Sequence, residues 1–353
     1  TSGVDAGSLA PMPELNVIKP NGQPTFGYFP QTPSVINWDD FIYRTPMGGT
    51  QNRIRNYLDR KQFQYIGVVS DELLVGCALA DFSFLGVAFV YTYEPATQNL
   101  EELSIKVPLA QGFELTNRPL DGTSTVNAKG SKIRIDAQPE PRSVSLDIEL
   151  SSGLKVDAKF SLARPFETQP MAVLTQTGKT GWTFTEKIAG VTAEGSVSGS
   201  FGTLDLATIG ACAHYDYSIG YMRRETFWNW ACFSGRADDH VVGLNLSCGV
   251  NETSFSENCI WIDGQMIPVG PTHFDYNRAA PAQDQWSVAT ADGQVELTFE
   301  PEGAHEEHLN VGLIASNFVQ VFGKFSGVFR PQGGSPIEIK NLYGFCEDQY
   351  MKA

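Results

Sequence analysis

Apolar and polar residues alternate along several short runs of this chain. Residues 142–150 place Val144, Leu146, Ile148 and Leu150 at every second position, and residues 154–162 repeat the pattern. Alternation with a period of two is typical of a β-strand with one buried face. Ser-Ser-Gly separates the two runs, so we predict an antiparallel hairpin here.

The same reading extends to the rest of the chain. Residues 259–267 form a second hairpin pattern, in which Asp263-Gly264 supplies the positive φ angles of a tight turn. The 34 glycines and 20 prolines separate these runs from one another. We predict further strands at residues 182–185, 240–247, 286–289, 295–300 and 317–325.

Helical patterns are scarce by comparison. Residues 50–64 place Ile54, Tyr57 and Leu58 at helical spacing, and one or two short helices are expected in all. The histidines of the His-Glu-Glu-His run at 305–308 are three apart and not four, so the run does not match a metalloprotease helix. Because it follows Pro301-Glu302-Gly303, it is expected to be a solvated loop. Many short strands between turns predict an all-β sandwich or barrel.

A length of 353 residues exceeds one typical domain and favours two domains over three. Glycine and serine accumulate between residues 181 and 202, which suggests a boundary there. We therefore expect a flexible N-terminal tail at 1–24, an N-terminal β domain at 25–190 and a C-terminal β domain at 191–353.

The charge and the cysteines limit the classes of partner and site. A net charge of −15 disfavours nucleic acid and an anionic bilayer as the main partner, although a local basic patch leaves peripheral membrane contact open. The six cysteines show neither zinc spacing nor a disulfide framework. We expect buried thiols, no metal or other cofactor, no protein partner and a cytoplasmic location.

The segment from 214 to 264 is unusual because it carries polar and aromatic residues where strands are expected. An unpaired buried polar group costs about 1 to 3 kcal/mol, so such strands are expected to line a cavity. Trp228 and Trp230 are two apart and share a strand face, which fits core packing as well as ligand contact. Asp216 and an arginine, Arg223 or Arg224, fit a buried ion pair as well as a functional site. Glu257 is similarly open between strand-end hydrogen bonding and a role as an acid.

At these residues the chain resembles the domain of unknown function 2804 family, in the lipocalin-like superfamily with hydroxyneurosporene synthase and the AttH proteins. The segments that carry the resemblance, at 216–220, 226–231, 243–246, 257–264, 320–327 and 344–348, cover the C-terminal half, while 61–65 and 81–91 match more weakly. The resemblance implies two tandem lipocalin-like β units with an apolar ligand pocket in or between them. Relatives hydrate or cyclise isoprenoid or polyketide-derived substrates without a redox cofactor.

Together these features favour an enzyme that acts by proton transfer on a hydrophobic, unsaturated small molecule such as an isoprenoid, through hydration, dehydration, isomerisation or cyclisation. A carboxylic acid buried in an apolar barrel keeps its proton closer to neutral pH. The candidate catalytic residues are Asp216, Glu257 and His214, and the candidate substrate-binding residues are Tyr217, Arg223, Trp228, Trp230 and Asn245.

The alternative is a lipid or isoprenoid carrier of lipocalin type, in which the same residues hold a polar head and the barrel encloses the tail. A filled barrel with a structural role is the third reading. A ligand-sized void beside Trp230 and Asn245 would argue against that third reading.

Overall fold

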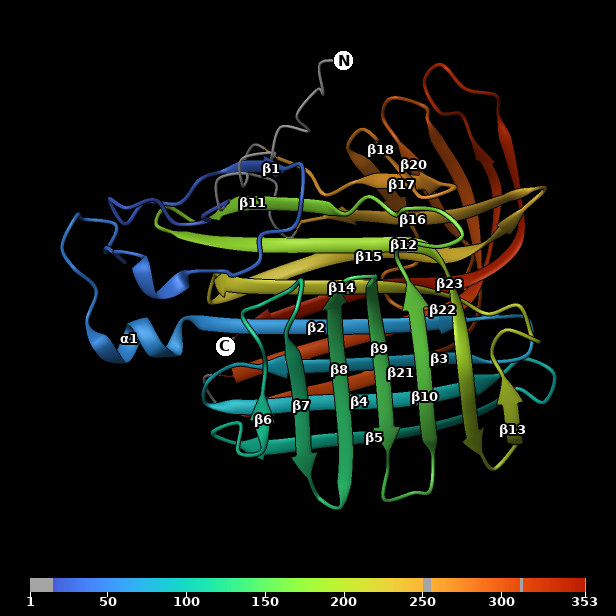
Figure 1. Ribbon diagram of the computed structural model, residues 1–353, viewed down its shortest axis with the longest axis horizontal. Coiled ribbons are helices and arrows are strands. Elements are labelled where there is room, and N and C mark those ends of the chain that lie inside the picture. Colours follow the sequence, from blue (N-terminus) through green and yellow to red (C-terminus); the bar gives the residue numbers. More distant parts are fainter. Residues whose placement is uncertain (1–14, 250–254, 312–313, 353) are drawn as a thin grey trace, which may run out of the picture.

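The computed structural model describes residues 15–249, 255–311 and 314–352, and strands make up nearly all of its regular structure (Figure 1). Within these ranges, helical structure is limited to α1 (Arg53–Leu58) and a 3₁₀ turn, η1 (Trp38–Asp40). No helix in the described part of the chain is long and apolar enough to cross a membrane.

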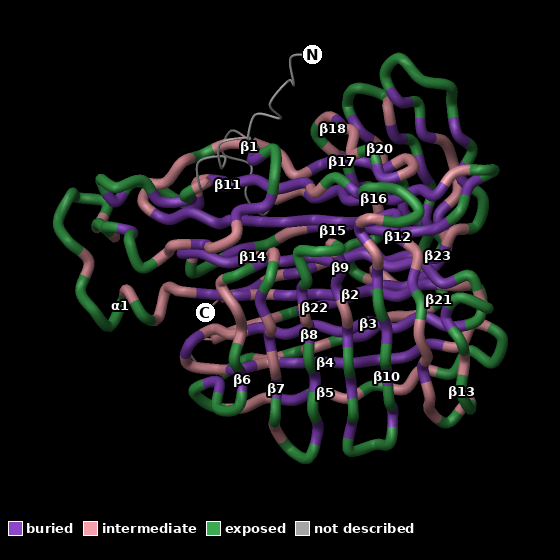
Figure 2. The backbone as a smooth tube through the Cα atoms, in the orientation of Figure 1, coloured by how far each residue is buried: buried purple, intermediate pink, exposed green. Residues whose placement is uncertain are grey.

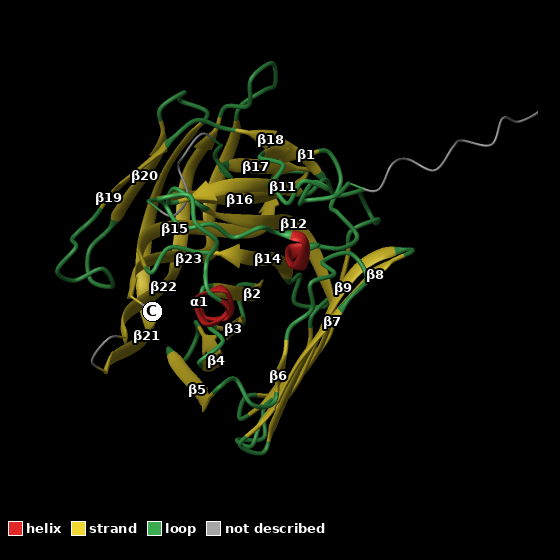
Figure 3. Cartoon of the chain, turned by 90° about the vertical axis from the view of Figure 1, so that its left-hand side faces the viewer, coloured by secondary structure: helices red, strands yellow, loops and turns green. Residues whose placement is uncertain are grey.

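The first sheet has 14 strands, and its main path runs β5-β4-β3-β2-β14-β12-β10-β9-β8-β7-β6, with β1, β11 and β13 attached beside it. All of its pairs are antiparallel. In Figure 3, strands β6 to β9 stand at an angle to β2–β5, so the sheet curls into a half-barrel. Its strands are β1 (Gly27–Phe29), β2 (Arg60–Val69), β3 (Leu74–Asp81), β4 (Leu85–Glu94), β5 (Asn99–Pro108), β6 (Phe113–Glu114), β7 (Thr123–Ala128), β8 (Ser131–Pro139), β9 (Arg142–Glu149), β10 (Lys155–Ser161), β11 (Met171–Thr177), β12 (Gly181–Gly199), β13 (Gly202–Asp205) and β14 (Cys212–Tyr221).

The second sheet has nine antiparallel strands in the order β18-β17-β16-β15-β23-β22-β21-β20-β19, and it forms a second half-barrel. The described part of the chain is therefore all-β and folds as two curled sheets in tandem, in agreement with the two β units that the family resemblance implies. Its strands are β15 (Glu225–Ala237), β16 (His240–Cys248), β17 (Cys259–Ile262), β18 (Gln265–Pro268), β19 (Thr272–Asp275), β20 (Trp286–Thr290), β21 (Val295–Val311), β22 (Ile314–Phe329) and β23 (Ile337–Lys352).

Each sheet encloses a hydrophobic core of its own, and a third cluster lies between the sheets. Ile66 and Leu146 belong to the first core, and Phe233 and Phe299 to the second. The cluster between the sheets is mainly aromatic and is built from both: Tyr65, Phe89, Tyr91, Trp230, Phe322 and Phe345. Five of the six cysteines are also buried, as expected.

Burial along the strands shows which of them have neighbours on both faces (Figure 2). In β8 and β10, buried and exposed residues alternate, because one face of these strands is open to solvent. Nearly every residue of β2, β3 and β14 is buried. These central strands carry the first core on one face and meet the second sheet on the other.

Both predicted hairpins are confirmed. Strands β9 and β10 pair with Glu149 opposite Lys155, and β17 and β18 pair with Ile262 opposite Gln265. The short helix expected within residues 50–64 is present as α1, but it ends at Leu58, because residues from Arg60 onward belong to β2. The loop expected at residues 305–308 is wrong, since these residues lie within β21 and His305 is buried.

The predicted tail and domain limits have the following positions relative to the strands of the two sheets. Residues 1–14 of the tail expected at 1–24 lie outside the described residues, and Val17 and Ile18 are buried against the first core. Residue 190 falls inside β12, and sheet membership changes between Tyr221 and Glu225. Sheet membership alone does not define domains, so the proposed limits of 25–190 and 191–353 stay a prediction.

A contact between two glycines brings β12 against β16 of the other sheet. Gly190 lies in a bulge of β12 with φ +70°, and its N–H donates to Ser234 Oγ over 2.8 Å. A Cβ at Gly190 would come within 3.0 Å of the backbone nitrogen of Gly243. The two sheets can approach this closely only without a side chain at residue 190.

We expect Gly190→Ala to lower the free energy of unfolding by about 2 to 4 kcal/mol, through positive-φ strain and overpacking together. Chemical denaturation measures this loss. Gly210→Ala is the matched control, since Gly210 has φ +65° and nothing within 4 Å of its Cβ position. Equal losses in the two variants would show that the contact with Gly243 contributes nothing.

Candidate functional site

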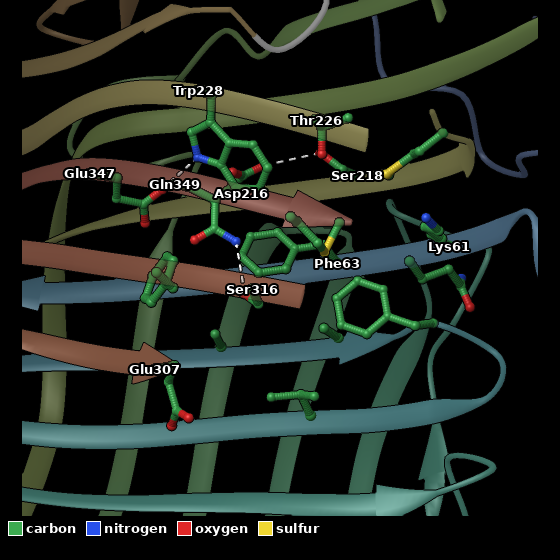
Figure 4. A pocket seen from close by; sticks show the side chains of 18 of the residues that line it. Lys61, Phe63, Asp216, Ser218, Thr226, Trp228, Glu307, Ser316, Glu347 and Gln349 are labelled. Atoms are coloured by element: carbon green, nitrogen blue, oxygen red, sulfur yellow. Dashed lines mark hydrogen bonds between the residues drawn. The ribbon is translucent and has the colours of Figure 1, made fainter. Parts of the chain in front are cut away.

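A cavity of about 180 Å³ lies between the two sheets, on the face of each that points away from its own core (Figure 4). Strands β12, β14, β2, β3 and β4 of the first sheet form one wall. Strands β15, β23 and β22 of the second sheet form the opposite wall. The cavity is therefore completed only when both sheets are folded and packed together.

Strand register places the first wall's side chains in rows. Lys187, Asp216 and Tyr65 are direct neighbours on β12, β14 and β2. Two residues further along each strand, the next row consists of Thr185, Ser218 and Phe63. The same alternation sends every second residue of these strands into the first core.

The second wall is ordered in the same way. Trp230 of β15 is opposite Glu347 of β23, which is opposite Gln320 of β22. In the next row, Trp228, Gln349 and Phe318 are neighbours. Across the cavity, Lys187 on the first wall faces the Trp230 ring and interacts electrostatically with the Glu347 carboxyl group on the second wall.

One end of the cavity, named here the inner end, holds one lysine and three carboxyl groups: Lys187, Asp216, Glu257 and Glu347. The Lys187 ammonium forms an ion pair with Asp216, and its Nζ lies 3.7 Å from Glu257 Oε1. The same Nζ lies 5.5 Å from the centroid of the Trp230 ring, a cation–π distance. Glu347 is the third carboxyl group on the cavity wall.

Burial raises the pKa of two of these carboxyl groups. The pKa of Asp216 is raised to about 6 by desolvation, and the Lys187 ammonium opposes part of that shift. The pKa of Glu347 is raised to about 7 by desolvation, and hydrogen bonds from Trp228 and Gln320 oppose it. Both groups can therefore exchange a proton near neutral pH.

A hydrogen-bond network fixes the orientation of Glu347. Trp228 Nε1 donates to one carboxyl oxygen over 2.9 Å, and Gln320 Nε2 donates to the other over 2.7 Å. The oxygen of Gln320 accepts hydrogen bonds from the hydroxyls of Tyr65, over 3.0 Å, and Tyr91. Because its oxygen is engaged by two hydroxyls, Gln320 must present its amide N–H groups to Glu347.

Of the candidate residues from the sequence, Asp216, Glu257, Trp228 and Trp230 line the cavity. Trp228 and Trp230 share a face of β15, as the two-residue spacing predicts. The partner of Asp216 is Lys187 and neither of the two arginines considered. Arg223 itself lies in the connection between β14 and β15, and its carbonyl accepts a hydrogen bond from Lys61 over 3.5 Å.

Tyr217, Asn245 and His214 do not reach the cavity wall. Tyr217 follows Asp216 along β14, so it points into the first core, and its hydroxyl donates to the Thr116 carbonyl over 2.8 Å. Asn245 accepts from Trp230 Nε1 over 2.8 Å and donates to the Glu257 carbonyl over 2.9 Å. Asn245 therefore positions two cavity residues instead of contacting a ligand.

His214 is buried behind the cavity. Its ring stacks on Tyr65, and its Nε2 lies 3.2 Å from Cys232 Sγ. Burial, together with the nearby Lys187 charge, lowers the pKa of His214 to about 3. The imidazole is therefore neutral at physiological pH, which fits a packing and positioning role better than that of a base.

This burial makes His214 a source of acid sensitivity. A histidine pKa lowered from 6.5 to about 3 contributes stability that is complete above pH 6.5 and is lost as the pH falls towards 3. We expect the unfolding free energy of His214→Phe, relative to the native protein, to rise below pH 6 by up to about 1.4 kcal/mol per pH unit. Urea denaturation between pH 8 and pH 4 measures the difference. A difference that does not change with pH would contradict a buried neutral imidazole.

Sequence reasoning missed Lys187 and Glu347 as site residues. Lys187 belongs to an alternating set, Thr183, Thr185 and Lys187, whose polar side chains interrupt an otherwise apolar strand. This alternation of polar residues in the sequence could have identified the face of the strand that lines the cavity. Glu347 lies in the 344–348 segment that carried part of the family resemblance, but only the register with Trp230 places it at the site.

The family model of the domain of unknown function 2804 matches residues 13–352. None of the curated proteins matches the sequence. Among solved structures, kievitone hydratase from Nectria haematococca is 11% identical with a TM-score of 0.53, over 84% of this chain and 90% of that chain. CghA with Sch210972 is 8% identical with a TM-score of 0.54, over 83% of this chain and 89% of that chain. These structural similarities extend over both half-barrels and concern the fold. The chain belongs to the domain of unknown function 2804 family.

Proposed function

We propose that this protein is an enzyme that transfers protons to and from a hydrophobic, unsaturated small molecule, such as an isoprenoid, in a hydration, dehydration, isomerisation or cyclisation. The observation that carries the proposal is the buried group of Asp216, Glu257, Glu347 and Lys187 at the inner end of the cavity. Three carboxyl groups facing one ammonium leave an excess of acid groups, and keeping them all ionised in a buried site is unfavourable. A transferable proton is the expected result.

The geometry suggests different roles for the two walls. Glu347, with its pKa near 7, would donate a proton to one carbon of the substrate double bond. The positive charge that develops on the neighbouring carbon would be stabilised by the faces of the Trp228 and Trp230 rings. Lys187 Nζ already lies 5.5 Å from the centroid of the Trp230 ring, so this ring interacts with a cation in the protein itself.

The second half of the reaction would use Asp216, which Lys187 keeps partly ionised. In a hydration, Asp216 would take a proton from the water that attacks the cationic carbon. In an isomerisation, it would take a proton from the carbon next to the cation. In a dehydration, Glu347 would instead protonate the hydroxyl group of the substrate, which would leave as water, and Asp216 would take the proton from the carbon next to the resulting cation. Returning that proton to Glu347 would restore the starting state, so neither oxidant nor reductant is needed.

The similar structures support this class of reaction. Kievitone hydratase is named for a hydration, and CghA was solved with the small molecule Sch210972. Both share the arrangement of two half-barrels with this chain. An identity of about a tenth gives no guidance on the substrate.

The size of the cavity limits the substrate. Ligand pockets usually measure about 300 to 1,000 Å³, whereas this one holds about 180 Å³. We therefore expect a small or slender ligand. Phe63, Phe82, Phe84 and Phe89 line the cavity together with the charged residues, so most of the ligand should be apolar.

That apolar lining also favours the second candidate function, a carrier of hydrophobic small molecules. One experiment separates the two. Molecules that co-purify with the protein are identified by mass spectrometry and then incubated with fresh protein in D₂O. An enzyme of the proposed type introduces deuterium on carbon, whereas a carrier returns the molecule unchanged.

A further inference from the structure

Two hydroxyl groups that have no role in the proposed reaction line the cavity beside Asp216. They belong to Ser218 on β14 and Thr185 on β12, which are direct neighbours in the strand register. Every other residue of β14 is buried, whereas Ser218 is partly exposed. Because β14 is paired on both sides, with β12 and β2, this exposed surface of Ser218 faces the cavity (Figure 4).

The hydrogen bonds of these hydroxyls have a defined direction. Ser218 Oγ donates to Asp216 Oδ1 over 3.5 Å and lies 3.2 Å from Thr185 Oγ1. A serine hydroxyl has a single hydrogen, so Thr185 must be the donor in the second bond. Ser218 Oγ therefore keeps one lone pair that can accept a hydrogen bond from a molecule in the cavity.

The two carboxyl oxygens of Asp216 have different neighbours. Oδ2 is paired with the Lys187 ammonium, whereas Oδ1 accepts the bond from Ser218. That bond is long, and a carboxylate oxygen can accept more than one hydrogen bond, so Oδ1 can also bind a water. A water that donates one hydrogen to Asp216 Oδ1 and the other to Ser218 Oγ keeps both of its lone pairs free to attack a cation.

The cavity has room for such a water and a substrate together. One water needs about 10 to 15 Å³, a small part of a cavity of about 180 Å³. Glu347 lies on the second wall, whereas Ser218 and Asp216 lie on the first. A double bond between the walls can therefore receive the proton from one side and the water from the other.

Hydroxyl groups at this place also distinguish between the reactions. A cation formed in an isomerisation or a cyclisation must be protected from water, and apolar side chains around the base would provide that protection. Phe63 is such a side chain, but the other two residues of its row are Ser218 and Thr185. Their hydroxyls can bind water beside the base, which favours hydration and its reverse, dehydration.

We propose that Ser218 and Thr185 are positioning residues that hold a water against Asp216, and that the reaction at this site is the hydration of a carbon–carbon double bond. The proposal deepens the proposed function and rests on it. The π electrons of the double bond take the proton of Glu347 and form the new C–H bond. A lone pair of the water then forms the C–O bond, and Asp216 Oδ1 takes one proton from that water. Transfer of this proton from Asp216 to Glu347 completes the cycle, in which one water is consumed.

The test uses water that is labelled in both elements, D₂¹⁸O, and the co-purified molecules identified by mass spectrometry. A hydration gives a product with deuterium on carbon and heavy oxygen, whereas an isomerisation gives a product with deuterium alone. We expect mainly the doubly labelled product from the native protein. Ser218→Ala should lower the ratio of heavy oxygen to deuterium in the product by about tenfold, because the attacking water loses one hydrogen bond.

Two variants of Thr185 cover the case in which Ser218→Ala fails to fold. Thr185→Val should lower the same ratio by about threefold or more, whereas Thr185→Ser keeps the hydroxyl and should stay within about twofold of the native ratio. Ser316→Ala is the matched control, because Ser316 lines the opposite wall of the cavity and bonds to Gln349 over 3.3 Å. Its ratio should also stay within about twofold of the native value.

The outcomes separate this proposal from the proposed function. Deuterium without heavy oxygen in the product of the native protein would overturn the water site and retain the proton-transfer enzyme. A product without deuterium on carbon would refute both. A crystal structure of the native protein adds a readout that needs no turnover: an ordered water bonded to Asp216 Oδ1 and Ser218 Oγ supports the site, and its absence from that position would overturn the proposal.

Discussion

Replacing Lys187 with methionine is expected to lower the free energy of unfolding by about 3 to 5 kcal/mol. Lys187 is the cation that pairs with Asp216 and Glu257 at the inner end of the cavity. Without it, two carboxyl groups remain buried with no counter-charge from this residue. Denaturant unfolding at pH 7.5, where the carboxyl groups are driven to ionise, measures the loss.

The cause of this loss can be separated from a general packing defect. Lys187→Met combined with Asp216→Asn removes one of the stranded carboxyl groups, so the double variant should be more stable than Lys187→Met alone. Lys106→Met serves as the matched control, since the Lys106–Glu307 pair is partly exposed and should cost about 1 kcal/mol or less. A double variant no more stable than the single one would show that the charge of Asp216 is not what Lys187 neutralises.

The second large effect concerns turnover. Asp216→Asn keeps the size of the side chain but removes the carboxylate that would accept a proton. We expect deuterium incorporation into the co-purified ligand to fall by about 10² to 10⁴-fold, the usual contribution of a general acid or base. Affinity for the ligand, measured by calorimetry, should stay within a few fold, because the apolar lining is unchanged.

Asp157→Asn is the control for the turnover prediction, since Asp157 is exposed on β10 and lies outside the cavity. It should leave deuterium incorporation unchanged. Incorporation by Asp216→Asn within tenfold of the native rate would exclude Asp216 as the group that moves the proton. Loss of binding together with turnover would instead assign Asp216 to holding the ligand.

The fold could be predicted from the sequence wherever one face of a strand meets solvent. The hairpin of β9 and β10 alternates clearly because every second residue is exposed. The helix predicted at residues 50–64 was too long, because the run from Arg60 onward is a strand that is buried on both faces. Such a strand lacks the alternation of apolar and polar residues that would identify it. Residues 301–303 were taken as a break, yet β21 absorbs its proline and glycine in a bulge between Pro301 and Gly303.

The site was predictable in its residue types but not in its pairing. Asp216, Trp228 and Trp230 stood out as unusual residues for core strands, and they do line the cavity. The adjacent Tyr217 was grouped with Asp216, although neighbours on a strand point to opposite faces. Lys187 and Glu347 depend on the register of strands far apart in the chain, which no local pattern encodes.

The position of the cavity between two separately packed half-barrels has a consequence for the divergence of such proteins. Residues on its walls, such as Phe63, Ala80 and Val87, belong to neither of the two barrel cores. Mutations there can therefore change which ligand the cavity binds without destabilising the two barrel cores. Selection for a new substrate can act on the cavity walls while the two half-barrels are conserved.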